Sequence, residues 1–228
     1  MMKPLVLVHT AAAHVQTFAA LLAELAPAVA ARHVVAAHLL EEARRRGGVD
    51  AELAERACRE LLAAAEDAAV VLCTCSTLGP CAEAAARRSA TPILRLDRAM
   101  AEAAVDAGRR ILAVACLETT LAPTVDLIRD AARRRGREVE VEVLLLAEAW
   151  TRFERGERDA YLDAIAAALR ENAARADAIV LAQASMADAA ARCGDLGVPV
   201  LASPRLGLAA ALRILAAAGA ATSPAPGR

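Results

Sequence analysis

The segment Ala69–Pro80, AVVLCTCSTLGP, predicts a buried strand that leads through a polar turn into a helix. Ala69–Leu72 is a short apolar run with β-branched residues, and the polar run Thr74–Thr77 contains Cys75. In an open α/β sheet, ligands bind beyond the carboxyl ends of the strands, so we expect chemistry at this turn. The amides at the start of the helix favour a thiolate, and we therefore expect the pKa of Cys75 to lie below its usual value.

The segments around this turn occur twice in the chain. Three pairs of segments recur in the same order: Leu5–Thr10 with Ile111–Cys116, Ala69–Ser76 with Ala178–Ser185, and Thr91–Leu94 with Val198–Leu201. Strands that alternate with helices form parallel sheets. The sequence therefore predicts an α/β fold of two pseudo-symmetric lobes, each a parallel sheet flanked by helices, whose strand ends share one cleft. We expect residues 1–97 and 204–221 in the first lobe, residues 98–203 in the second, and residues 222–228 as a disordered tail.

Local signals place the elements between these repeats. Apolar residues recur at helical spacing over residues 13–26, and Pro27 ends that helix. Residues 33–38 are predicted as a strand, Arg44–Gly48 as a loop, and Asp50 as the N-cap of a helix.

The composition argues against nucleic-acid or membrane partners. The formal net charge is −1 and aromatic residues make up 2% of the chain, so neither a basic surface nor stacking platforms are expected. No uninterrupted apolar run approaches the roughly 20 residues of a membrane span. Because Met1–Thr10 lacks the layout of a signal peptide, we expect a cytoplasmic protein.

The six cysteines do not indicate disulfides or a metal site. A chain of 228 residues without a secretion signal can bury a core without disulfides. Cys73, Cys75 and Cys81 form a CxCx5C cluster, whereas a zinc site usually needs four ligands in paired spacings. The four histidines lie between His9 and His38, away from this cluster in the sequence. We therefore predict no metal site.

At its two turns the chain resembles the aspartate/glutamate/hydantoin racemase superfamily. Cys75-Ser76-Thr77 is similar to the first-lobe motif Cys-Asn-Thr of that superfamily, and Gln183-Ala184-Ser185 falls where the second lobe has Gly-Cys-Thr. The likeness extends over nearly the whole chain. It implies the racemase fold, a small carboxylate substrate and no cofactor. Dimers are common in the superfamily, so the resemblance also suggests a homodimer, although no residue here specifies one.

The second cysteine of the superfamily is absent, because Ala184 takes its place. A cofactor-independent racemase uses two acid–base groups on opposite faces of one carbon, and losing one typically costs about 10²–10⁴-fold in rate. Relatives with altered cysteines include arylmalonate decarboxylase, which keeps only the second-lobe cysteine, and maleate cis–trans isomerase, in which the first-lobe cysteine is the nucleophile. The resemblance implies an isomerase or racemase-like enzyme that acts through Cys75. A one-cysteine decarboxylase and a non-catalytic binding protein for small acids are the alternatives.

Three residues are weighed as acid–base groups. Cys75 is the first candidate, as base or nucleophile, although a buried packing thiol is the alternative. His9 ends the first strand and is a second candidate, since it could orient the thiol or move a proton; a histidine satisfied within the core fits equally well. Cys116 ends the matching strand of the second lobe, where a core thiol is favoured.

Polar residues at the turns are candidates for substrate binding, because hydroxyls and turn amides can hold a carboxylate or an enolate oxygen. These candidates are Thr10, Ser76, Thr77, Thr119, Thr120, Gln183 and Ser185. Helix capping explains the serines and threonines as well. Arg98 and Arg205 follow the fourth strand of each half, where a surface position, an ion pair between the lobes and carboxylate binding are all open.

Overall fold

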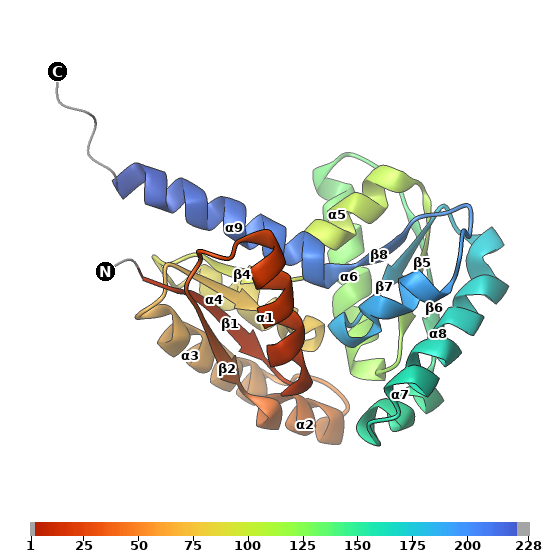
Figure 1. Ribbon diagram of the computed structural model, residues 1–228, viewed down its shortest axis with the longest axis horizontal. Coiled ribbons are helices and arrows are strands. Elements are labelled where there is room, and N and C mark those ends of the chain that lie inside the picture. Colours follow the sequence, from red (N-terminus) through yellow and green to blue (C-terminus); the bar gives the residue numbers. More distant parts are fainter. Residues whose placement is uncertain (1–2, 223–228) are drawn as a thin grey trace.

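The strands form two parallel sheets that lie side by side (Figure 1). The computed structural model describes residues 3–222, and in it the four-stranded sheets have the orders β2-β1-β3-β4 and β6-β5-β7-β8. The strands are β1 Leu5–His9, β2 Ala31–Val35, β3 Val70–Cys73, β4 Ile93–Arg95, β5 Arg110–Ala115, β6 Glu140–Leu145, β7 Ala178–Leu181 and β8 Val200–Ala202. The two orders correspond strand by strand, which confirms the predicted α/β fold with two pseudo-symmetric parallel lobes.

Helices follow almost every strand and cover both faces of the sheets. The α-helices are α1 Ala13–Leu25, α2 Ala37–Arg46, α3 Ala51–Ala65, α4 Gly79–Ala86, α5 Arg98–Ala107, α6 Glu118–Arg134, α7 Ala147–Glu154, α8 Arg158–Asn172 and α9 Ser203–Thr222. Short 3₁₀ helices are η1 Ser76–Leu78, η2 Ala173–Arg175 and η3 Ala184–Arg192. Among the described residues, no helix combines the length and the apolar character that crossing a bilayer requires.

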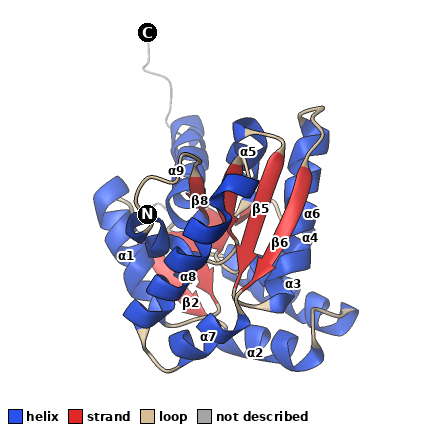
Figure 2. Ribbon diagram, turned by 90° about the vertical axis from the view of Figure 1, so that its right-hand side faces the viewer, coloured by secondary structure: helices blue, strands red, loops and turns tan. Residues whose placement is uncertain are grey.

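The alternation of side chains along the central strands gives each sheet two apolar cores. In β1, Val6 and Val8 pack with α2, α3 and α4, whereas Leu5 and Leu7 pack on the opposite face with α1 and α9. The second sheet is covered in the same way, by α7 and α8 on one face and α5 and α6 on the other (Figure 2). Because both faces are covered, the central strands are continuous apolar runs rather than alternating ones.

Several local predictions need correction. Residues 37–46, predicted partly as strand and partly as loop, form α2, which ends at Gly47 with a φ of 74°, a backbone angle that glycine adopts without strain. The structure also contains α7, which the sequence pattern did not predict. The predicted cap of α3 is confirmed, since the Asp50 side chain accepts a hydrogen bond from Leu53 N. Residue 222 ends α9, and the rest of the predicted disordered tail lies outside the described residues.

Helix α9, which runs from the second lobe back to the first, and an ion pair join the two lobes. Helix α9 leaves the second sheet after β8 and packs on the first, where Leu208 lies in the core with Leu5. A Cβ at Gly207 would lie 2.1 Å from the carbonyl oxygen of Leu96, so this close approach requires glycine. Arg98 of α5 donates to Asp130 of α6 at 2.6 Å and also pairs with Glu83 of α4 in the first lobe. Of the roles weighed for Arg98, the structure therefore supports the ion pair between the lobes.

Candidate active site

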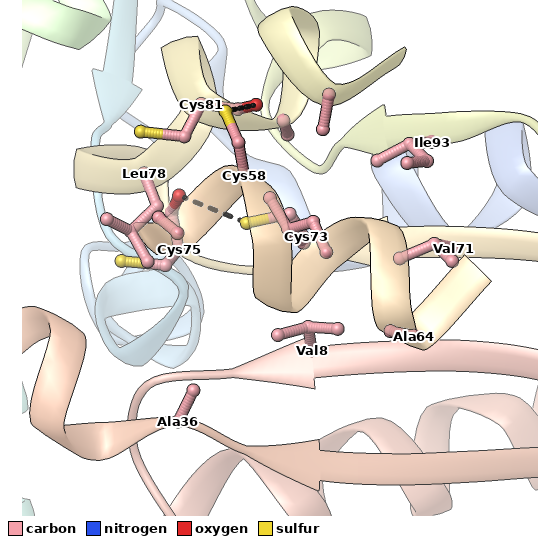
Figure 3. Close-up of a cluster of buried hydrophobic side chains, with 14 of the residues drawn as sticks. Val8, Ala36, Cys58, Ala64, Val71, Cys73, Cys75, Leu78, Cys81 and Ile93 are labelled. Carbon is pink, nitrogen blue, oxygen red and sulfur yellow. Dashed lines mark hydrogen bonds between the residues drawn. The ribbon is translucent and has the colours of Figure 1, made fainter. Parts of the chain in front are cut away.

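Cys75 lies at the carboxyl end of the first sheet, as the apolar run before it predicts. Strand β3 ends at Cys73, and Cys75 is the residue from which η1 starts. The whole turn is buried, and Leu78 N donates to the carbonyl of Cys75 at 3.1 Å. Figure 3 shows the thiol of Cys73 directed back at that same carbonyl, at 3.8 Å. The turn is therefore fixed by its own backbone and by the core beneath it.

A pocket lies between the lobes at this turn. The first lobe contributes Thr10, Ala11, His14, Leu40, Thr74, Cys75, Ser76 and Thr77, and the second contributes Leu117, Thr120, Trp150, Gln183, Ala184 and Ser185. The predicted site residues are thus brought together, with the exceptions of His9 and Thr119. The cavity measures about 30 Å³, roughly the volume of one water molecule in the liquid. A substrate of several heavy atoms therefore requires the pocket lining to move.

The environment of Cys75 differs from the sequence expectation. Burial raises the pKa of the Cys75 thiol, and this effect outweighs the hydrogen bonds that favour the thiolate, which come from the Thr10 hydroxyl and from Leu78 and Thr77. The expected low pKa is therefore wrong for this closed arrangement, although the amides at the start of η1 act in the expected direction. At neutral pH the thiol carries its proton.

His9 lies behind the pocket and uses both of its ring nitrogens. Thr74 Oγ1 donates to the carbonyl of Val8 at 3.2 Å, so it accepts from Nδ1–H of His9 at 2.8 Å. The other nitrogen, Nε2, then accepts from Nδ1–H of His33 at 2.9 Å. Burial and the neighbouring histidines His14 and His33 lower the pKa of His9 to about 3. This neutral histidine orients Thr74, and its predicted catalytic role stays a prediction.

His14 lines the pocket, and sequence reasoning missed it. It lies in the first turn of α1, directly after the loop that follows β1. Both ring nitrogens are buried and have no hydrogen-bond partner among the described residues, and burial lowers the pKa of His14 to about 4. The available signal was its position, because the start of a helix after a strand is where α/β folds place ligands.

The second lobe closes the pocket with polar groups that are mostly paired. Gln183 Oε1 accepts from the backbone N–H groups of Cys116 at 2.5 Å and Leu117 at 3.1 Å. The hydroxyl of Ser185 lies 2.8 Å from the hydroxyl of Tyr161. These bonds join the ends of β5, β7 and α8, so they hold the second-lobe turn in place.

Two further contacts define the rim of the pocket. The hydroxyls of Thr77 and Thr120 lie 3.3 Å apart and connect the two lobes directly. Trp150 stacks on Phe153, and its buried Nε1–H has no hydrogen-bond partner in the part of the chain that the structure describes. The rim therefore offers a hydroxyl pair and an unused donor, both suited to an anionic oxygen.

The side chains of Thr119 and Cys116 do not line the pocket. Thr119 lines a separate cavity of about 520 Å³, together with Cys58 and Cys81. Cys116 is packed in the core of the second lobe, where burial raises its pKa to about 12. Within residues 3–222, no group of histidine, cysteine and acidic side chains is arranged to hold a metal ion.

Two repeated α/β lobes with a thiol in the pocket between their strand ends define the class of this protein. The model of the Asp/Glu/hydantoin racemase family matches residues 5–211. The chain therefore belongs to the Asp/Glu/hydantoin racemase family, as the two turns and the repeat predict.

Solved structures with the same fold include racemases and a decarboxylase. Picrophilus torridus aspartate racemase is 11% identical, with a TM-score of 0.71 over 96% of this chain and 95% of that one. Thermus thermophilus glutamate racemase in complex with β-chloro-D-alanine is 16% identical, with a TM-score of 0.67 over 99% and 85%. A mutant of arylmalonate decarboxylase, with a glycine changed to cysteine and a cysteine to serine, is 20% identical, with a TM-score of 0.55 over 100% and 97%. A comparison with curated protein sequences finds no significant match.

Proposed function

We propose that this protein is a cofactor-independent isomerase that moves a proton at the α-carbon of a small carboxylic acid, with Cys75 as one acid–base group. The observation that carries the proposal is the thiol of Cys75 in a buried pocket between the lobes, within reach of the Thr10 hydroxyl and the amides of η1. These donors stabilise the thiolate once a proton has left the sulfur. The same thiol can then take a proton from carbon or return one.

The remaining polar groups of the pocket suit a carboxylate. Ser76, Thr77 and Thr120 lie at the start of η1 and α6, and their hydroxyls belong to both lobes. We propose that the substrate carboxylate takes the place of the direct contact between Thr77 and Thr120, since an anionic oxygen accepts from both hydroxyls. Charge that develops on the carboxylate as the α-proton leaves is then held by groups already in position. Thr119, Gln183 and Ser185 have weaker support, because Thr119 lies outside the pocket and the other two are paired within the second lobe.

Decarboxylation is the second candidate reaction. It needs one proton donor for the carbanion that remains when carbon dioxide leaves, and Cys75 alone supplies one. The observation that favours it is Ala184, which has no proton to give at the second-lobe turn. A binding protein without catalysis is the third candidate, although a binder has little use for a thiol among donors that stabilise its anion.

Deuterium incorporation tests these candidates. The protein is incubated in D₂O with amino acids, 5-substituted hydantoins and 2-substituted malonates, and Cys75→Ala is the matched control. Cys75-dependent deuteration at the α-carbon supports the isomerase, and release of carbon dioxide from a malonate supports the decarboxylase. If no probe reacts and one of them raises the melting temperature, the binding protein is supported and the isomerase is refuted.

We further propose that the protein works in the cytoplasm as a homodimer. The six cysteines are buried and unbridged, which suits a reducing compartment. Native mass spectrometry of the intact chain tests the dimer, and a monomer at micromolar concentration would contradict it.

A further inference from the structure

His14 lines the pocket from the first lobe, and Ala184 lines it from the second. His14 is four residues before Phe18 on α1, so both side chains project from one face of the helix, and their ring centroids are 6.3 Å apart. Phe18 is packed in the same apolar cluster as Ala184. Both His14 and Ala184 line the pocket that contains Cys75. The imidazole therefore borders the same pocket as the second-lobe turn, where the side chain of Ala184 has no proton to exchange.

The ring nitrogens of His14 make no hydrogen bond within residues 3–222, unlike those of His9. Both are buried and have no hydrogen-bond partner within residues 3–222, whereas His9 bonds Thr74 and His33. Buried polar groups are nearly always paired, so two unpaired nitrogens on the wall of a pocket indicate a partner that binds there. A histidine that only filled space next to Phe18 would have no need of two unsatisfied polar atoms.

We propose that His14 is the second acid–base group of this protein and acts on the face of the substrate carbon opposite Cys75. This inference rests on the proposed isomerase function. His14 would supply the second acid–base group that is missing at Ala184. It would do so from α1 of the first lobe instead of from the second-lobe turn.

The proton transfers balance for this pair. In one direction the α-C–H bond breaks, the proton forms an N–H bond on neutral His14, and the electron pair remains on the substrate as an enolate. The S–H bond of Cys75 then breaks, and its proton forms the new C–H bond on the opposite face. The imidazolium releases its proton to solvent and the thiolate takes one from solvent. The imidazolium–thiolate pair holds the same number of protons and performs the reverse reaction.

The two faces can be tested separately with the full-length chain. Each enantiomer of an amino acid that the wild type deuterates is incubated in D₂O with His14→Gln and with Cys75→Ala. We expect His14→Gln to lose α-deuteration of one enantiomer by about 10²-fold or more, while the other still exchanges at Cys75 with retention of configuration. Cys75→Ala should show the opposite preference. His38→Gln, which changes an exposed histidine of α2, is the matched control and should deuterate both enantiomers like the wild type.

The outcomes separate this inference from the proposed function. If the wild type exchanges and His14→Gln affects both enantiomers equally, His14 has only a structural role and this inference fails, while the isomerase stands. If the wild type deuterates no probe, the isomerase fails and the role of His14 fails with it. Should His14→Gln lower the melting temperature, His14→Asn is measured in the same way, because a folding defect reduces exchange of both enantiomers together.

Discussion

Replacing the Thr10 hydroxyl should make the Cys75 thiol less reactive. Thr10→Val keeps the shape of the side chain but removes the hydroxyl that stabilises the Cys75 thiolate. A hydrogen bond to a charged group contributes about 1.5–3 kcal/mol, and about 1.4 kcal/mol corresponds to tenfold in an equilibrium. The thiolate population of Thr10→Val should therefore fall by roughly 10- to 100-fold at any pH below the thiol pKa. Because the substitution raises that pKa, the difference should shrink as the pH rises above it.

Alkylation by iodoacetamide measures this change, with the Cys75 peptide quantified by mass spectrometry. The rate at pH 8 should fall in Thr10→Val in proportion to the thiolate population. Thr91→Val is the matched control, because it removes a hydroxyl bonded to Ala65 O, at 3.1 Å, next to the start of β4. An unchanged rate in Thr10→Val, or an equal decrease in Thr91→Val, would refute the proposed stabilisation of the thiolate by Thr10.

Three further predictions concern histidines, the rim and the lobes. Burial lowers the pKa of His9 to about 3 and of His14 to about 4, so the unfolded chain binds more protons than the folded chain below pH 6.5. The free energy of unfolding should therefore fall by about 2 kcal/mol per histidine between pH 6.5 and 5. Urea titrations at several pH values should show that the stability of His9→Leu depends less on pH than that of the wild type. Trp150→Phe removes the unpaired Nε1–H and should weaken binding of an amino acid that the wild type deuterates by roughly tenfold, as measured by calorimetry. The melting temperature should change little. Arg98→Gln removes the partly buried ion pair between the lobes. Since ion pairs near the surface contribute about 1 kcal/mol or less, it should increase alkylation of Cys75 by roughly two- to fivefold. Arg134→Gln removes a pair within one lobe and should leave the alkylation rate unchanged.

The central strands and the repeat could be predicted because burial leaves a strong pattern. Strands such as β1 and β3 are covered on both faces, and their apolar runs therefore stand out from the sequence. Helix α2 could not be predicted in the same way, because only Leu39 and Ala43 of its residues are buried. Two buried residues are too few to show a helical repeat, so the pattern of this segment does not distinguish a helix from a charged loop.

The part of the candidate site that lies at the carboxyl ends of the strands could be predicted from the sequence. Cys75 and the turn around it follow from the rule that parallel strands present their carboxyl ends at one edge. The distinction between His9 and His14 does not follow from that rule, since both histidines come at or just after the end of β1. It depends on the hydrogen bonds of Thr74 and His33 with His9, which arise from three segments far apart in the sequence.

Closure of the lobes determines the protonation states on which the proposed chemistry depends. Burial raises the pKa of Cys75 and lowers those of His9 and His14, and in each case it is the largest cause. In the closed pocket both proposed acid–base groups are therefore neutral, one with a proton to give and the other with a lone pair to accept one. When the lobes separate, water reaches both groups and their pKa values return toward ordinary values. A thiolate and an imidazolium left by one turnover are then reset by solvent, so opening serves proton exchange as well as release of the product. A disulfide between Thr77→Cys and Thr120→Cys should accordingly stop α-deuteration in D₂O, and its reduction should restore only the slower rate of a variant that lacks the two carboxylate-binding hydroxyls.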